Sequence, residues 1–374
     1  AAASTFIGFG AFAASDTATA PAAAPTAAPL PPAVAHVGLT SPVYTGADSD
    51  LNVAFRRLGK RDWLTKTKAL QDLAVAFPDR SRDVLADCLP FWTYVFPKLC
   101  LDNDRRVREA TFVAFTQLVT AVRKGIAKYL PALITPWWCG MVDPVRDVAT
   151  AATGAFHAAF SPAKRHQATL FVVPDLVAGL TSILAQSRDD LSDPKYVAPA
   201  DAEDRLERAH VAAVVGLGKL LGVLATTPAP AGGAGADATA APSGDLSPLD
   251  VAVPFVRQAL LSKVAPVRCA AYRFVRDAIQ HSQAWVTMHV SVLAPTLFGA
   301  VGDKVGANRG PLLDVILVMA RGMDSIWGVV DPSKAFMPGM LASAKRAFYG
   351  AGLPAYRSML PLVASLPADV LARR

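Results

Sequence analysis

Apolar residues return at helical spacing after three copies of one short motif. Each copy is an acidic turn or its equivalent followed by Val-Arg, at Val107-Arg108, Val145-Arg146 and Val267-Arg268. Counted from each Val, an apolar or small residue stands at positions +3, +7 and +11. Residues at this spacing lie on one face of an α-helix. Each copy therefore predicts an amphipathic helix that begins directly after a turn.

Weaker copies extend this register along the chain. In them Lys68, Arg208 and Arg309 take the place of the motif arginine, and the six basic positions are then separated by 40, 38, 62, 60 and 41 residues. A period near 40 residues is typical of two-helix HEAT-type units, which stack on their neighbours. We therefore predict an all-α, HEAT/armadillo-like helical-repeat solenoid, a fold that works mainly as a binding surface.

Three segments interrupt or precede the repeats. Residues 187–204 are rich in Asp and residues 226–248 in Pro and Gly, and neither has helical periodicity, so we expect two solvated, mobile loop insertions. Residues 1–50 contain no Lys or Arg and open with an Ala/Pro-rich stretch, which predicts a disordered leader. The solenoid is then expected over residues 51–374, as the N-terminal part of a longer protein.

Composition and charge narrow the possible functions. Of 374 residues, 52% are hydrophobic, enough for a large core. Without the three aspartates of the leader, 37 basic and 27 acidic residues remain, a net charge near +10. The sequence has no P-loop, no dinucleotide glycine fingerprint and no Cys/His cluster with metal-ligand spacing, so we expect no catalytic residue, metal or cofactor here. We expect the four cysteines to be reduced core thiols of an intracellular protein.

Several short runs resemble the N-terminal region of the listerin family. The two specific ones are Phe6-Ile-Gly-Phe-Gly10 and Leu101-Asp-Asn-Asp-Arg-Arg-Val-Arg-Glu-Ala-Thr111. Weaker matches follow in the family's order along nearly the whole chain: Leu58-Gly-Lys-Arg-Asp62, Thr65-Lys66-x-Lys68-Ala69, Ala158-Ala-Phe160 with Pro162 and Lys164, Leu191-Ser-Asp-Pro194, Val267-Arg-x-Ala270 with Tyr272, and Leu360-Pro-Leu with Leu366-Pro367.

Listerins are large RING-type E3 ubiquitin ligases of ribosome-associated quality control. The resemblance implies that the full-length protein binds a large (60S) ribosomal subunit carrying a stalled nascent chain and ubiquitinates that chain for degradation. A RING needs about eight Cys/His ligands, and that signature is missing here. Zinc and the ubiquitin-conjugating enzyme are therefore expected only at an absent C-terminal RING.

For this segment the resemblance implies docking. Its expected partners are the rRNA and proteins of the large subunit and the peptidyl-tRNA-sensing quality-control protein. The expected location is the cytosol, on the ribosome, with no membrane or DNA partner.

Two groups of basic residues are the candidates for docking. The first surrounds Trp63, and the second lies in a turn just before an apolar stripe. They are Arg56, Arg57, Lys60, Arg61, Lys66 and Lys68, and then Arg105 and Arg106. Phosphate backbones attract such clusters without sequence preference. The alternative for the first group is a solvated helix face, because the first repeat of a solenoid must expose a polar cap.

The motif arginines are predicted to form a structural ladder instead. Arg108, Arg146, Arg268 and Arg309 recur with the repeat, so we expect each to pair with an acidic turn of its own or the adjacent unit. By proximity in sequence, the expected pairs are Asp104–Arg108, Asp143–Arg146 and Asp303–Arg309. Direct RNA contact is the alternative.

The adjacent tryptophans Trp137 and Trp138 follow a proline on a predicted helix. One of them is expected in the core, because neighbouring residues on a helix point about 100° apart. The second is a candidate anchor for a partner, with core burial as its alternative.

The chain as a whole is also compatible with two further protein classes. It could be a karyopherin-like helical-repeat transport or scaffold protein, although the net positive charge argues against an acidic cargo-binding face. An enzyme with a site of another kind is the third possibility.

Overall fold

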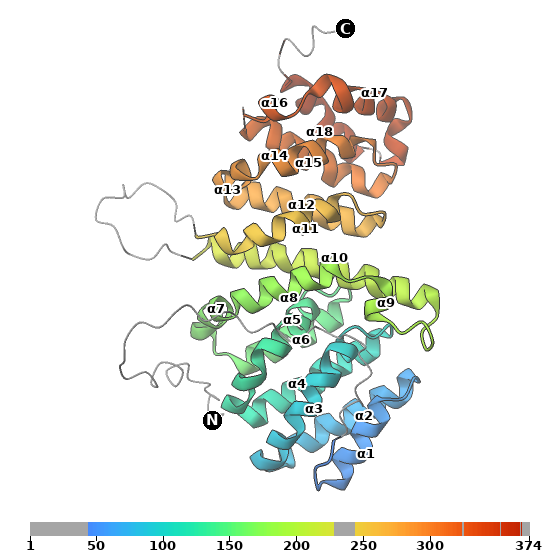
Figure 1. Cartoon of the computed structure of the whole chain (residues 1–374), viewed down its shortest axis with the longest axis vertical. Helices are drawn as coiled ribbons and strands as arrows, with labels where there is room; N and C mark the ends of the chain where they lie inside the picture. The colour runs from blue at the N-terminus through green and yellow to red at the C-terminus, as the bar shows by residue number, and fades with distance from the viewer. Residues whose placement is uncertain (1–43, 228–243, 324, 352, 367, 369–374) are drawn as a thin grey trace, which may run out of the picture. The chain divides into compact units, whose positions relative to one another are not determined.

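The chain is helical throughout the part that the computed structural model describes, which comprises residues 44–227, 244–323, 325–351, 353–366 and 368, and no strand occurs there. These residues form two compact units. One unit contains the described residues up to 182 and residues 186–208, and the other contains 183–185 and the residues from 209 onward. The predicted all-α helical-repeat solenoid is confirmed (Figure 1).

Helices of the first unit stack in two rows. They are α1 (Ser49–Leu58), α2 (Trp63–Ala76), α3 (Arg82–Cys100), α4 (Arg105–Val122), α5 (Leu130–Gly140), α6 (Arg146–Ala159), α7 (Pro162–Phe171), most of α8 (Val173–Ala185), α9 (Arg188–Leu191) and the start of α10 (Pro199–Ala225). Helices α2, α4 and α6 pack in sequence as one row, and α3 packs on α5 in the other (Figure 1).

The second unit repeats this arrangement. Besides the rest of α10 it contains α11 (Val253–Leu260), α12 (Ala265–His281), α13 (Gln283–Met288), α14 (Val290–Gly299), α15 (Gly306–Gly322), α16 (Ile326–Val329), α17 (Met337–Lys345) and α18 (Leu353–Ala364). Helices α12, α15 and α18 form one row, and α11, α14 and α16 the other. Helix α10 is long and apolar enough to cross a membrane by length and composition alone, but half of its apolar window is buried, as in the core helix of a folded domain.

The predicted apolar stripes face the core. Of the nine positions at +3, +7 and +11 in the three strong motif copies, all but Ala110 are buried. Of the two readings of the second tryptophan, core burial is confirmed and the partner anchor is not, because Trp137 and Trp138 are both almost completely buried. Trp137 lies between Phe115 and Phe156, with ring centroids 4.7 and 5.5 Å away, and its indole N–H donates to a backbone carbonyl of α6.

An ion pair that recurs with the repeat joins neighbouring helices of a row. In the first unit, Arg108 of α4 donates to both carboxylate oxygens of Asp143, at 2.8 and 3.3 Å. Its Nη1 also donates to the carbonyls of Asp102 and Asn103, at 2.8 and 3.2 Å, in the turn before its own helix. Asp143 in turn accepts the N–H of Val145 and so shapes the turn that precedes α6. One guanidinium thus fixes two successive turns.

The second unit contains the same arrangement. Arg268 of α12 donates to both oxygens of Asp303, at 2.9 and 2.8 Å, and to the carbonyls of Ser262 and Lys263. In both pairs the acid lies 35 residues after the arginine.

Lys66 and Asp102 form the equivalent link in the first repeat. They lie 36 residues apart in sequence, and the ammonium and carboxylate are 2.6 Å apart. The basic residue of this link is therefore Lys66, whereas Lys68, which the sequence register favoured, is exposed.

These pairs differ from the ones expected by proximity in sequence. Asp143 pairs with Arg108 and Asp303 with Arg268, each reached from the preceding repeat, and Asp104 pairs with Arg106. Pairing with the adjacent unit is thus confirmed for Arg108 and Arg268, whereas the pairs named by proximity were wrong, because these two side chains extend to the turn before the next helix of their row.

The remaining two arginines of the predicted ladder differ from each other. Arg309 is completely buried and donates to the hydroxyl of Ser343, 34 residues on, and to the carbonyl of Val301, so a serine replaces the acid. Arg146 is exposed and has no ion pair among the described residues. Placing Arg146 in the ladder was therefore wrong, because its expected partner, Asp143, already binds Arg108.

Residues 44–50, which the sequence assigned to the leader, belong to the folded part of the chain. Residues 1–43 lie outside the described part of the chain, but Tyr44 is buried, and its ring packs edge-on against Phe55 at 5.0 Å. Asp48 accepts the N–H of Leu51 at the start of α1 and pairs with Arg80. The folded domain therefore includes at least the last seven residues assigned to the leader.

The Asp-rich insertion is folded. Residues 187–204 contain α9 and the first turns of α10, and Leu191 and Ser192 are buried. The expectation of a solvated, mobile loop was wrong because its short helix and backbone carbonyls find partners in the first unit: Asn103, for example, donates to the carbonyl of Asp201 at 3.0 Å. In the other predicted insertion, 226–248, residues 228–243 lie outside the described part.

The buried ladder pair Arg108–Asp143 is expected to contribute far more to the free energy of unfolding than an exposed ion pair does. Asp143→Ala should lower the free energy of unfolding by about 3–5 kcal/mol, because it leaves a buried guanidinium without its carboxylate. Asp72→Ala is the matched control: it removes the exposed Arg57–Asp72 pair and should cost less than about 1 kcal/mol. Urea denaturation followed by circular dichroism measures both. Equal losses of unfolding free energy in the two variants would show that the ladder pair stabilises the fold no more than an exposed pair does.

A second prediction follows from the acid–base equilibrium of Asp303. Burial raises its pKa, but hydrogen bonds from Arg268, Asn308 and Val305 outweigh this and lower the pKa from 3.8 to about 2. The charged carboxylate therefore stabilises the fold above pH 4, and this stability is lost as the pH falls toward 2. The stability difference between the natural protein and Asp303→Asn should shrink by about 2 kcal/mol over that range. A difference that does not change with pH would contradict this.

Candidate functional site

The structure divides the eight candidate docking residues into four groups. Lys66 is bound to Asp102 with both side chains mostly buried, so its charge is neutralised within the fold. Arg57 forms an exposed pair with Asp72. Lys68 and Arg105 are exposed, and no ion pair of theirs occurs among the described residues. The other four candidates, Arg56, Lys60, Arg61 and Arg106, have more specific surroundings.

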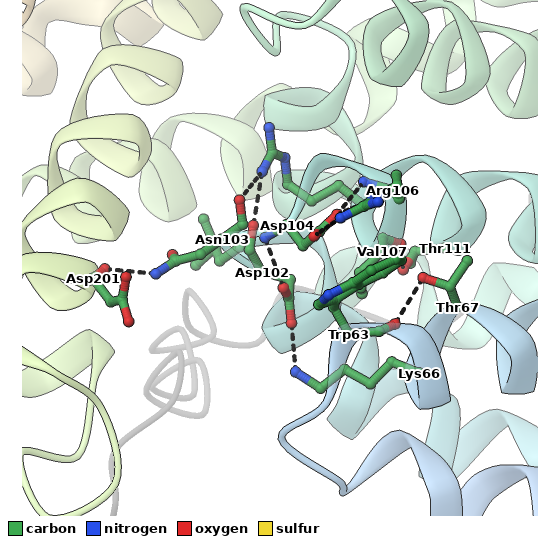
Figure 2. Close-up of polar contacts among 12 residues, drawn as sticks. Trp63, Lys66, Thr67, Asp102, Asn103, Asp104, Arg106, Val107, Thr111 and Asp201 are labelled. Atoms are coloured by element: carbon green, nitrogen blue, oxygen red, sulfur yellow. Dashed lines mark hydrogen bonds and ion pairs between the residues drawn. The ribbon is translucent and has the colours of Figure 1, made fainter.

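Arg106 is held in one orientation. Its guanidinium lies over the ring of Trp63, 3.3 Å from the ring centroid, and donates to both oxygens of Asp104 at 3.0 and 2.7 Å. Figure 2 shows this stack beside the Lys66–Asp102 link, where the turn before α4 meets the start of α2. The hydrogen bond from Arg106 is the main cause that lowers the pKa of the Asp104 carboxyl. About half of the Arg106 side chain remains exposed, so it can still meet an external anion.

Arg56, Lys60 and Arg61 line a cleft of about 600 Å³ in the first unit. We call it the N-terminal cleft. Its walls come from α1 and the turn after it, from the C-terminal half of α3, and from the segment 191–197 between α9 and α10. Its remaining basic residues are Lys66, Lys98 and Arg205.

The charges in the cleft are unbalanced. Asp102 and Asp193 are the only carboxylates among its described lining residues, and Asp102 is already bound to Lys66. The other five basic residues form no ion pair with a carboxylate in the described part of the chain. Arg205 is the most constrained of them: its Nη1 donates to the carbonyl of Leu191 and the hydroxyl of Ser192, both at 3.3 Å. Its Nε is buried without a hydrogen-bond partner, and burial lowers its pKa.

Sequence reasoning missed the half of this site that comes from distant segments. Lys98 and Arg205 lie far from the basic cluster in sequence, and the wall residue Tyr196 lies in a segment that its composition assigned to a loop. The cluster of Arg56, Lys60 and Arg61 was visible in the sequence. No signal in one sequence shows that residues 191–205 fold back onto it.

The described residues offer no sign of metal chemistry. No group of three or more His, Cys, Asp or Glu side chains among them could hold a metal ion. Of the four cysteines, Cys88, Cys100 and Cys139 are buried, and burial raises the pKa of the Cys139 thiol to about 12. Such thiols are protonated packing groups at neutral pH.

The fold defines an all-α helical-repeat protein whose first unit contains a cation-lined cleft. Residues 47–366 match the family described as the N-terminal domain of E3 ubiquitin-protein ligase listerin. The chain belongs to this family. Membership of this family rules out the karyopherin-like alternative that the sequence had left open.

Relatives named E3 ubiquitin-protein ligase listerin extend along most of the chain. The protein of Mus musculus is 28% identical over 334 residues, which are 86% of this chain and 18% of that protein. The Gallus gallus protein is 26% identical, with the same coverage, and the Xenopus tropicalis protein is 24% identical over 81% of this chain and 17% of its own length. The chain therefore spans less than a fifth of the length of these relatives.

Proposed function

We propose that this chain is the ribosome- and partner-docking N-terminal domain of a RING-type E3 ubiquitin ligase that acts in ribosome-associated quality control. Membership of the listerin family supports the ligase. The observation that carries the docking role is the set of basic residues in the first unit that have no carboxylate partner within the described protein, namely Arg56, Lys60, Arg61, Lys98 and Arg205. A folded domain that leaves so many cations unpaired in one place favours an anionic partner.

Docking on the large subunit would begin with electrostatic capture. Exposed cations such as Lys60, Arg61 and Arg105 attract the rRNA backbone and displace its condensed counterions, a contribution that falls with salt. Arg106 adds orientation, because Asp104 and Trp63 hold its guanidinium before any contact is made. A pre-oriented side chain loses less conformational entropy on binding than a free one.

We assign ubiquitin transfer by the whole protein to regions outside this segment. In the proposal, zinc and the ubiquitin-conjugating enzyme bind at a C-terminal RING, and this segment contributes no catalytic residue or cofactor. Besides the subunit, its partner is the quality-control protein that senses peptidyl-tRNA. The location is cytosolic and ribosome-associated. Isolated, the 374-residue chain should bind large subunits but transfer no ubiquitin.

The test is co-sedimentation of the chain with purified large ribosomal subunits over a salt series. Binding should weaken steeply as salt rises. The double variant Lys60→Glu/Arg61→Glu should reduce the slope of log affinity against log salt by about 2, because two phosphate contacts are lost. Arg105→Glu/Arg106→Glu tests the turn before α4 in the same way.

The control is Arg273→Glu, which reverses an exposed charge on α12 in the second unit. It should leave subunit binding nearly unchanged. Binding that ignores salt, or that weakens equally in all three variants, would contradict a docking surface in the first unit.

A further inference from the structure

The N-terminal cleft has the construction of a ligand site rather than of a charged surface. Three segments far apart in sequence enclose it, and its volume of about 600 Å³ lies in the range of small-ligand and peptide pockets. The segment 191–197 forms one wall, and Arg205 fastens that wall through the carbonyl of Leu191 and the hydroxyl of Ser192. The wall therefore has a defined position in the absence of a ligand.

The cleft is lined by both apolar and cationic side chains. The apolar lining comes from Phe55 and Leu58 of α1, Phe91 and Val95 of α3, and Leu191 of the wall. The cations Arg56, Lys60, Arg61, Lys98 and Arg205 belong to the same cleft. Among the described lining residues, Asp193 is the one carboxylate that pairs with no lysine or arginine of the described chain. A complementary ligand combines several negative charges with an apolar group.

The aromatic rings of the cleft distinguish between two anionic ligands, single-stranded RNA and an acidic peptide. Single-stranded RNA binds by stacking bases on free ring faces. Here the ammonium of Lys98 lies 3.7 Å from the Tyr94 ring centroid, and the guanidinium of Arg61 lies 5.1 Å from that of Tyr196. One face of each ring is thus covered by a cation. An aliphatic and phenyl lining with cations around it fits apolar side chains flanked by carboxylates better than it fits bases.

We propose that the N-terminal cleft binds an acidic peptide segment of a partner protein, with an apolar side chain of that segment buried between α1, α3 and the 191–197 wall. Carboxylates of the peptide pair with Lys98 and Arg205. The inference deepens the partner-docking part of the proposed function, but it concerns a protein ligand and needs no ribosome for its test.

The test is isothermal titration calorimetry of the 374-residue chain with a dodecapeptide of aspartate and glutamate that contains two leucines and one phenylalanine. The peptide should bind. Lys98→Glu should weaken binding at least about tenfold through charge repulsion, and Tyr196→Ala should weaken it by a similar factor through loss of a wall contact. Neither residue is substituted in the ribosome test, and the peptide assay contains no ribosome, so failure of one proposal is distinguishable from failure of the other.

Two controls make the result specific. Arg146→Glu reverses an exposed charge elsewhere in the first unit and should leave the peptide affinity unchanged. A peptide of equal charge with glycine in place of the apolar residues should bind at least about tenfold more weakly. Thermal melts matching the natural protein show that each variant is folded.

Three outcomes would overturn the proposal. The peptide could fail to bind, or Lys98→Glu and Tyr196→Ala could leave its affinity unchanged. The glycine peptide could also bind as tightly as the peptide with apolar residues. A decauridylate RNA that binds more tightly than the peptide, and is weakened by the same two variants, would assign the cleft to RNA instead.

Discussion

The repeated link between a basic side chain on one helix and the turn before the next helix in the same row is the interaction on which the rest of the structure depends. Lys66–Asp102, Arg108–Asp143 and Arg268–Asp303 join residues 35 or 36 positions apart, and Arg309 makes a related link to Ser343 within α17, 34 residues on. In the two arginine–aspartate pairs, the guanidinium also holds the carbonyls of its own preceding turn. Because each repeat of such a fold contacts mainly its neighbours, each of these links joins adjacent repeats and helps to hold their helices together.

This link has a consequence for charge. Asp102, Asp143 and Asp303 bind their ladder partners within the fold, so they cannot neutralise the exposed basic residues around them. The first unit therefore presents Arg56, Lys60, Arg61, Lys98 and Arg205 without carboxylate partners in the described chain. The architecture that holds the repeats together thus also leaves a cationic surface at the N-terminal end of the first unit.

The sequence predicted the parts of the fold that depend on periodicity. The +3, +7 and +11 stripes identified the core-facing helices, and the spacing of the basic positions identified the repeat. It left open whether a ladder arginine pairs within its own unit or with the adjacent one, because proximity in sequence favours Asp104 for Arg108, whereas helix packing brings Asp143 to it. It also failed for residues 187–204, whose polar composition gives no sign that Leu191 and Ser192 are buried or that Asp201 accepts a hydrogen bond from Asn103 in the turn after α3. Arg205 and Lys98 could not be assigned to the site for the same reason: tertiary contacts bring them to it.

Hydrogen–deuterium exchange of the natural chain and of Asp102→Asn tests most directly whether the ladder organises the first unit. Asparagine keeps the size of the side chain but removes the charge that Lys66 needs. The account predicts faster exchange in α1, α2 and the turn before α4, with no change in α12 and α15, because the lost link joins only adjacent repeats. Unchanged exchange in α1 and α2, or an equal increase across both units, would contradict it.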